Sequence, residues 1–305
     1  MSVLGIKRTA MNWILVLAGG FALVVLAVRL LENRFIYFPP RYPEGFSSPE
    51  NYGLRLEEVW LMTKDKVHLN ALFLPNGHSQ KVLLWFHGNA ENIGYGLGQM
   101  AEFSGLGVNV LAVDYRGYGK SEGSPDEAGV YCDADAAYDY LMEARHFRSE
   151  DIIIFGHSLG GAVAIDLASR RGCGGLIVQS SFSSAREMAR RMFRIPLFEY
   201  IPKSRFDSLS KIRRVRAPIL IMHGTCDEVV PFWMGKKLYA AAPEPKSLFS
   251  VEGAGHNDVL LVGGESFLNC LRQFITTCGD EAQSHVGESD MSDESDGGTG
   301  PKSAN

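Results

Sequence analysis

The most reactive arrangement in this sequence centres on Ser158, within the frame Gly156-His-Ser-Leu-Gly160. The two glycines permit a turn between a strand and a helix so sharp that the hydroxyl projects from the end of the strand. Because a free serine hydroxyl is a weak nucleophile, it needs a base held against it. Apolar residues precede the frame and an apolar helical pattern follows it, which favours this nucleophile elbow over an ordinary glycine-rich turn.

A base and an acid for this serine follow it in the chain, each in a loop just past a predicted strand. Asp227 comes after the apolar run 218–222 and next to Glu228, the alternative candidate for the acid. His256 comes after the strand-like run 247–251, in a loop whose glycines let it reach the serine. Of the eight histidines, His256 alone has both the order and the position that suit a general base, with the carboxylate holding its correct tautomer.

Two backbone amides are expected to stabilise the oxyanion that forms when a serine attacks a carbonyl group. One belongs to Leu159, the residue after the nucleophile. The other is predicted in the loop after the apolar strand 82–86, where we choose the amide of Asn89, with Ala90 as the alternative.

The loops that carry these residues require a sheet whose strands end at the same edge. The runs 54–61 and 67–74 predict an antiparallel hairpin at the start of the domain. Six further strands are predicted at residues 82–86, 108–113, 152–155, 175–179, 218–222 and 247–251. Helical spacings separate them, so we predict an α/β fold with a mostly parallel central sheet, helices on both faces and the reactive loops at the carboxyl ends of the strands.

One of the helices is predicted at about residues 129–144, where apolar residues recur at helical spacing. Asp133, Asp135 and Asp139 lie in the same segment. A pair of carboxylates can act in catalysis, but we interpret these three as part of a solvated helix face.

Five motifs stand in the order that is typical of one enzyme family. They are His87 to Ala90, Asp114 to Gly123, Gly156 to Gly160, His223 to Asp227 and Gly255 to Asp258. Together they resemble the α/β-hydrolase-fold serine hydrolases, and more narrowly the membrane-anchored α/β-hydrolase-domain-containing, or Bem46-like, branch, over about residues 35–278. The resemblance implies hydrolysis of an ester or thioester through an acyl-enzyme intermediate, with no metal or organic cofactor. Unlike the members that remove palmitoyl groups, this chain has no cysteine in its first residues.

An uncharged stretch of 20 residues, Thr9 to Val28, lies near the start of the chain. As a helix rising about 1.5 Å per residue it would be roughly 30 Å long, which matches the hydrocarbon thickness of a bilayer. We therefore expect an N-terminal membrane anchor over residues 1–34, with a single transmembrane helix at about 9–31. A cleavable signal peptide is the alternative, although its apolar region is usually only about 7–15 residues long. Basic residues on both sides of the stretch leave undecided which side of the membrane the domain faces.

Residues 35–279 are expected to form the catalytic domain, and residues 280–305 differ from it in composition. The latter contain seven acidic residues, one lysine and no aromatic residue. Such a segment cannot bury enough apolar surface to fold, so we predict a disordered acidic tail. Without its charge of −6, the formal charge of the chain would be +1 rather than −5.

Residues 181–216, which precede the strand that leads to Asp227, are predicted to form a short cap. They contain ten basic residues against three acidic ones, together with apolar residues. Such a mixture suits a lid that rests on anionic headgroups and admits an acyl chain. It suits equally well a solvated helix that packs one apolar face.

The sequence therefore predicts a membrane-anchored serine hydrolase that cleaves an acyl ester or thioester, with a lipid-like or acylated-protein substrate. A non-catalytic membrane scaffold of the same fold and a serine peptidase are the alternatives. We expect a monomer that needs no cofactor or metal. The sequence has neither a phosphate-binding loop nor a dinucleotide fingerprint, and nothing else in it supports a nucleic-acid partner.

Overall fold

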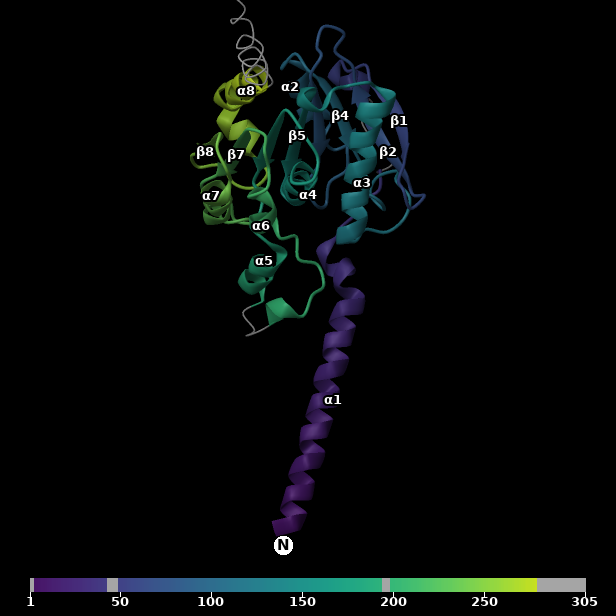
Figure 1. Cartoon of the computed structure of the whole chain (residues 1–305), viewed down its shortest axis with the longest axis vertical. Coiled ribbons are helices and arrows are strands. Elements are labelled where there is room, and N and C mark those ends of the chain that lie inside the picture. Colours follow the sequence, from purple (N-terminus) through teal and green to yellow (C-terminus); the bar gives the residue numbers. More distant parts are fainter. Residues whose placement is uncertain (1–2, 43–48, 194–197, 279–305) are drawn as a thin grey trace, which may run out of the picture.

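The structure is a computed structural model, and it describes residues 3–42, 49–193 and 198–278. Helix α1 (Val3–Ile36) projects from one end of a domain that is built around a single sheet (Figure 1). The predicted acidic tail, residues 280–305, lies outside the described residues.

The domain is organised around an eight-stranded sheet in the order β1-β2-β4-β3-β5-β6-β7-β8. Strand β2 is antiparallel to both β1 and β4, and all other neighbouring strands are parallel. The strands are β1 (Glu57–Met62), β2 (His68–Leu74), β3 (Val82–Phe86), β4 (Asn109–Val113), β5 (Ile152–His157), β6 (Gly175–Gln179), β7 (Ile219–Gly224) and β8 (Lys246–Val251). The predicted hairpin and the mostly parallel sheet are thus confirmed.

The six predicted strands from β3 to β8 agree with the structure to within two residues at each end. The largest differences are at the end of β7, which continues to Gly224, and at the end of β5, which continues through Gly156 and His157. These two residues pair with Val178 and Gln179 of β6, so the ladder keeps them extended. The strand therefore runs up to Ser158 itself.

Helices cover both faces of the sheet (Figure 1). They are α2 (Leu97–Ser104), α3 (Glu127–Asp139), α4 (Leu159–Ala168), α5 (Ala185–Met192), α6 (Ser208–Ile212), α7 (Phe232–Ala241) and α8 (Val259–Thr277). The helix predicted at about 129–144 is α3 followed by one π-helical turn, Tyr140–Ala144.

Two apolar clusters pack on the two faces of the sheet, because successive side chains of a strand point to opposite sides. In β3, Leu84 and Phe86 belong to one cluster with α3 and α4, whereas Leu83 and Trp85 belong to the other with α2 and α8. Each fully buried side chain of this size contributes about 1.5–3 kcal/mol to folding. Helix α4 is buried along its whole length, so the start of this helix has a fixed position in the domain.

Helix α1 is longer than the transmembrane helix predicted at about 9–31. Its segment Met11–Ile36 is long and apolar enough to cross a membrane. The apolar side chains of this segment are exposed, as Leu17 (69%) and Phe21 (65%) illustrate. A signal sequence near an N-terminus passes the same test of length and composition, so this test defines α1 as a candidate membrane span.

The segment 181–216, where we predict a cap, contains α5, the 3₁₀ turn η4 (Phe198–Tyr200) and α6. Residues 194–197 within it lie outside the described residues. In Figure 1, α5 lies below the sheet, on the side of the domain from which α1 projects. The cap segment and the candidate anchor thus share one side of the molecule.

The last turns of α1 are attached to this segment by a buried carboxylate. Glu32 accepts hydrogen bonds from the backbone amides of Lys203 (2.6 Å) and Ser204 (3.1 Å) and from the hydroxyl of Ser204 (3.0 Å). Arg29 donates through Nε to the carbonyl oxygen of Ile201 (3.1 Å). The helix therefore continues beyond residue 31, because its final turns pack as part of the domain.

Candidate active site

Ser158 lies on the break between β5 and α4, with φ of 54° and ψ of −113°. A positive φ is strained in a residue with a side chain, and such strain is common where a structure holds a reactive group. The flanking glycines make the turn possible. A Cβ atom on Gly156 would lie 2.1 Å from the carbonyl oxygen of Gly160, and one on Gly160 would lie 2.1 Å from that of Phe86. A sharp strand-to-helix turn is therefore present at the predicted position.

Three side chains that are distant in the sequence meet at this turn. His256 Nε2 lies 3.0 Å from Ser158 Oγ, and His256 Nδ1 lies 2.8 Å from Asp227 Oδ2. His256 and Asp227 are buried, whereas Ser158 is partly exposed. The imidazole is thus placed to accept a proton from the hydroxyl while its other nitrogen donates to the carboxylate.

The carboxylate of Asp227 has several donors around it. Its Oδ1 accepts hydrogen bonds from the amides of Val229 (2.9 Å) and Val230 (2.7 Å), and its Oδ2 lies 3.3 Å from His223 Nε2. Burial alone would raise the pKa of Asp227, but the hydrogen bonds from His223 and His256 hold this pKa well below its usual range. Asp227 is therefore ionised at neutral pH, as an acid that orients an imidazole must be.

Glu228, the alternative acid, is exposed and makes no hydrogen bond with His256 in the part of the chain that the structure describes. Its carboxylate lies beside Gly255 instead, where an added Cβ atom would be 3.0 Å from Glu228 Oε2. The geometry thus favours Asp227 over Glu228 as the partner of the imidazole.

The two predicted oxyanion donors come from the elbow itself and from the loop after β3, the strand next to β5. Leu159 begins α4 directly after Ser158, and the loop that contains Asn89 and Ala90 follows β3. Ala90 N already donates to Asn89 Oδ1 at 3.1 Å. Within the described ranges, the backbone amides of Asn89 and Leu159 donate to no other protein group. The assignment of the oxyanion donors to Asn89 and Leu159 stays a prediction.

The side chain of Asn89 has a role that sequence reasoning missed. Its Oδ1 accepts hydrogen bonds from Phe38 N (3.0 Å) and from the hydroxyl of Tyr118 (2.6 Å), and its Nδ2 donates to the carbonyl oxygen of Ile36 (2.6 Å). The end of α1 is thus bonded directly to the loop that carries the predicted oxyanion donor. Asn89 and Tyr118 belong to the motifs His87 to Ala90 and Asp114 to Gly123, but neither motif indicates a contact with Ile36 or Phe38.

A second histidine also lies beside the reactive one. The ring centroid of His157 is 5.2 Å from that of His256, and His157 Nδ1 is 3.6 Å from Glu91 Oε1. Burial alone would lower the pKa of His157, but the contact with Glu91 raises it above its usual value. Burial would raise the pKa of Glu91, whereas His157 lowers it to about 2. An ion pair therefore lies beside the imidazole of His256.

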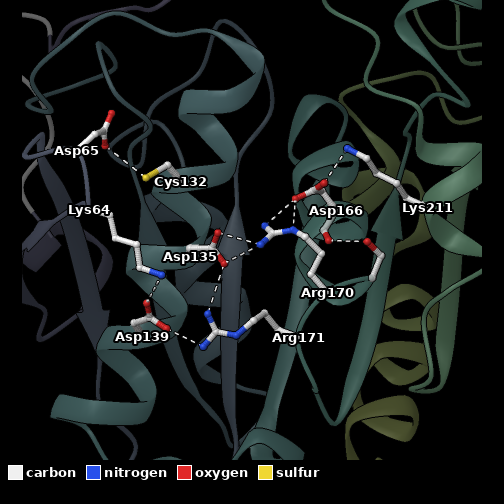
Figure 2. Close-up of polar contacts among 10 residues, drawn as sticks. Lys64, Asp65, Cys132, Asp135, Asp139, Asp166, Arg170, Arg171 and Lys211 are labelled. Carbon is white, nitrogen blue, oxygen red and sulfur yellow. Dashed lines mark hydrogen bonds and ion pairs between the residues drawn. The ribbon is translucent and has the colours of Figure 1, made fainter.

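Two of the acidic residues of α3 form ion pairs with the end of α4 (Figure 2). Asp135 pairs with Arg170 at 3.0 Å, and Asp139 pairs with Arg171 at 2.6 Å. Within the described structure neither carboxylate forms a hydrogen bond or ion pair with Ser158 or His256. These residues hold two helices together, which agrees with a non-catalytic interpretation.

Asp133, however, does not lie on a solvated face, so that expectation is wrong for this residue. It is fully buried, and its carboxylate accepts hydrogen bonds from the backbone amide (2.8 Å) and from Nε (2.9 Å) of Arg116. Burial raises the pKa of Asp133 to about 6, although Arg116 opposes this shift. The helix turns this position toward the sheet, where Arg116 supplies the partner that a buried carboxylate needs.

The fold and the site together define a class of protein. A mostly parallel sheet places the serine at a sharp turn after β5, and the acid and the histidine follow it in that order on later loops. This order and this turn are those of the α/β hydrolases.

Comparison with known proteins leads to the same class. The family model described as serine aminopeptidase, S33, matches residues 77–207, a range that includes Ser158 but ends before Asp227 and His256. The protein bem46 of Schizosaccharomyces pombe is 32% identical over 271 residues, which cover 82% of this chain and 90% of that protein. An uncharacterised protein of Mycobacterium tuberculosis is 34% identical over 255 residues, which cover 83% and 90%. The chain belongs to the α/β-hydrolase family that includes Bem46, and the resemblance noted from its motifs is confirmed.

Solved structures support the fold. An esterase of Pyrococcus furiosus superposes with a TM-score of 0.66 over 78% of this chain and 98% of its own, at 22% sequence identity. At this level of identity the similarity establishes the α/β-hydrolase fold, and the family relationship identifies the chain as a hydrolase.

Proposed function

We propose that this protein is a membrane-anchored serine hydrolase that cleaves an acyl ester or thioester through an acyl-enzyme on Ser158. The observation that carries the proposal is the pair of short contacts made by His256, 3.0 Å to the hydroxyl oxygen and 2.8 Å to the carboxylate of Asp227. An imidazole held in this way converts a weak nucleophile into a strong one.

In the proposed acylation step, Ser158 Oγ attacks the carbonyl carbon of the acyl group while His256 Nε2 takes its proton. Asp227 stabilises the imidazolium that results. The negative charge that develops on the carbonyl oxygen is stabilised by the amides of Asn89 and Leu159. When the tetrahedral intermediate collapses, the bond to the leaving alcohol or thiol breaks, and His256 donates its proton to that group.

In the deacylation step, water takes the place of the leaving group. His256 removes a proton from the water, and the hydroxide attacks the acyl carbonyl. Collapse of the second intermediate releases the carboxylic acid and returns the proton to Ser158 Oγ. No other reactant is required.

The surroundings of the site support a lipid-like acyl group. Phe38, whose amide bonds to Asn89, is 55% exposed, and Phe35 at the end of α1 is 70% exposed. Aromatic side chains at the end of an apolar helix are typical of the membrane interface. The candidate anchor therefore ends next to the loop at which the acyl carbonyl would be held.

A fluorophosphonate probe tests the nucleophile directly, because it reacts with an activated serine hydroxyl. The full-length protein in detergent is expected to be labelled, and Ser158→Ala is expected to abolish the labelling. Ser169→Ala, at the end of α4, serves as the matched control and should label like the unmodified protein. Labelling that survives in Ser158→Ala would show that the nucleophile lies elsewhere, and a wild-type protein that never labels would support the scaffold alternative.

A substrate panel tests the acyl group. Lysophospholipids, monoacylglycerols and acyl-cysteine peptides represent the proposed class, and aminoacyl anilides represent the aminopeptidase activity that the family description names. We expect turnover of the first three kinds only, and its complete loss in Ser158→Ala. Turnover confined to the anilides would favour the peptidase instead.

A further inference from the structure

A cavity of about 690 Å³ lies where the domain end of α1 meets α5 and η4. Five cationic side chains line it, those of Arg29, Arg186, Arg190, Lys203 and Arg205. Ser158, Asp227 and His256 are not among its lining residues, so the cavity is separate from the proposed reaction site.

The three carboxylates that also line this cavity are already engaged. Glu199 pairs with Arg190 at 3.1 Å, and Glu187 pairs with Lys237 at 2.5 Å. Asp207 caps the first turn of α6. With five cationic and three acidic side chains, the lining of the cavity keeps a formal charge of +2.

Two of the remaining cations, Arg29 and Arg186, are held by contacts with uncharged groups. Arg186, Lys203 and Arg205 form no ion pair with any residue that the structure describes. The guanidinium of Arg186 lies over the ring of Tyr200, 3.6 Å from its centroid, which restricts its orientation. Arg29 donates through Nε to the carbonyl oxygen of Ile201, and among the described residues its two terminal nitrogens have no hydrogen-bond acceptor. Several guanidinium groups around one space suit an anion with several oxygens, above all a phosphate.

The position of the cavity along α1 indicates where such a phosphate would come from. The uncharged stretch Thr9 to Val28 matches the bilayer hydrocarbon in length, and Arg29 is the first charged residue after it. Because Glu32 bonds α1 to the cap, the cavity stays at this level of the helix. Met192, at the end of α5, is 67% exposed on the same part of the cap.

We propose that this cavity binds the phosphate headgroup of an anionic phospholipid from the bilayer that holds α1. Arg29, Arg186 and Arg205 donate to the phosphate oxygens, while the acyl chains extend along the apolar surface of α1. The inference rests on the membrane anchorage of the proposed function but not on its chemistry. A bound lipid of this kind would fix the cap against the membrane.

The test uses the full-length protein reconstituted in nanodiscs of phosphatidylcholine with a minor fraction of phosphatidylserine. After transfer to detergent, the phosphatidylserine that remains bound is counted by mass spectrometry. The unmodified protein is expected to retain about one molecule per chain. The double variant Arg186→Gln/Arg205→Gln is expected to weaken this retention about tenfold or more, since it removes two charge-assisted contacts.

The matched control is Arg213→Gln/Arg214→Gln, which removes the same charge from a second basic cavity of about 730 Å³. That cavity lies at the amino ends of β6 and β7, whereas the elbow lies at the carboxyl end of β5. Retention should be unchanged in this control. An equal loss of retained lipid in both double variants would indicate a diffuse attraction to positive charge. Unchanged retention in Arg186→Gln/Arg205→Gln would show that this cavity does not bind the lipid. Either result would overturn the proposal. Displacement of the lipid by millimolar inorganic phosphate would assign the cavity to a soluble anion and would overturn it too.

Fluorophosphonate labelling of the same samples reports on the reaction site independently. Both double variants should label like the unmodified protein, which also shows that they are folded. Lost lipid with intact labelling supports the headgroup site. If the unmodified protein retains lipid but does not label, the catalytic proposal fails and the lipid site stands.

Discussion

Asp227 and Glu32 are both buried carboxylates, 7% and 6% exposed, yet their surroundings differ in kind. Asp227 faces two histidines and two amides at the end of a strand. Glu32 faces two amides and a hydroxyl, all from a segment more than 170 residues further along the chain. A carboxylate beside an imidazole can influence a proton transfer, whereas one surrounded by fixed donors can only hold two elements together. The difference separates the proposed reaction site from the contacts that hold α1 and the cap together.

The largest effect is expected from Asp227→Asn, which should lower kcat by roughly 10⁴-fold, because the amide no longer stabilises the imidazolium. Esterase activity on a soluble p-nitrophenyl ester measures it. Glu228→Gln is the matched control and should change kcat less than about twofold. If Asp227→Asn and Glu228→Gln lost activity equally, Asp227 would not be the sole acid that orients the imidazole, and the catalytic role assigned to it would be wrong.

Glu32→Ala is expected to act on stability rather than chemistry. It leaves the two buried donors of Ser204 and the part-buried amide of Lys203 without their acceptor, at a cost of roughly 2–4 kcal/mol. The melting temperature in detergent should fall by several degrees, while kcat on the soluble ester stays within a few-fold of the unmodified enzyme. Glu32→Gln keeps one acceptor oxygen and should lose less. A kcat that falls as far as in Asp227→Asn would erase the distinction between the two carboxylates.

Asn89 links the end of α1 to the proposed reaction site, so Asn89→Ala should lower activity less than Asp227→Asn and more than Glu32→Ala. Its side chain bonds the end of α1, and its backbone amide is a proposed oxyanion donor. We expect kcat to fall about tenfold with little change in KM, since a displaced amide weakens the transition state more than the bound substrate. Tyr118→Phe removes one of the same hydrogen bonds and should have a smaller effect in the same direction. A change in melting temperature alone would make Asn89 purely structural.

The smallest effect is expected from Glu91→Gln, and it should depend on pH. The pKa of Glu91 is lowered to about 2, so its ionised form stabilises the fold above about pH 4.3, and this contribution is lost as the pH falls toward 2. The pKa of His157 is raised, so its charged form stabilises the fold below about pH 6.5, and this contribution is lost as the pH rises through the raised value. The difference in melting temperature between Glu91→Gln and the unmodified protein should therefore be largest between about pH 4.3 and 6.5. A difference that is constant from pH 3 to 9 would refute the ion pair.

The loops that carry Ser158, Asp227 and His256 could largely be predicted from the sequence, because the patterns that indicate them are local. The glycines beside Ser158, the apolar runs that end in loops and the order of acid and histidine all lie within short stretches of chain. Such stretches encode a strand, a turn or a helix largely on their own. The sheet order and the meeting of Ser158, Asp227 and His256 follow from the topology that these elements adopt.

The contacts of Glu32 and Asn89 that attach α1 to the domain could not be predicted in the same way. Nothing near Glu32 in the sequence indicates that its donors are Lys203 and Ser204, and nothing near Asn89 indicates Ile36. Asp133 was misread for the same reason, since its burial depends on Arg116 from another element. A buried polar residue needs a partner that only the folded chain supplies, so its position is the hardest to predict from spacing.

The direct bond between Asn89 and the end of α1 has a consequence for how such an enzyme meets its substrate. If α1 is the membrane anchor that we propose, a domain bonded to it in this way would not swing freely, and Ser158 would stay at a set height above the bilayer. Molecules dissolved in the same leaflet then reach it by lateral diffusion in two dimensions. The velocity of the reaction would follow the mole fraction of substrate in the membrane rather than its concentration in the surrounding water.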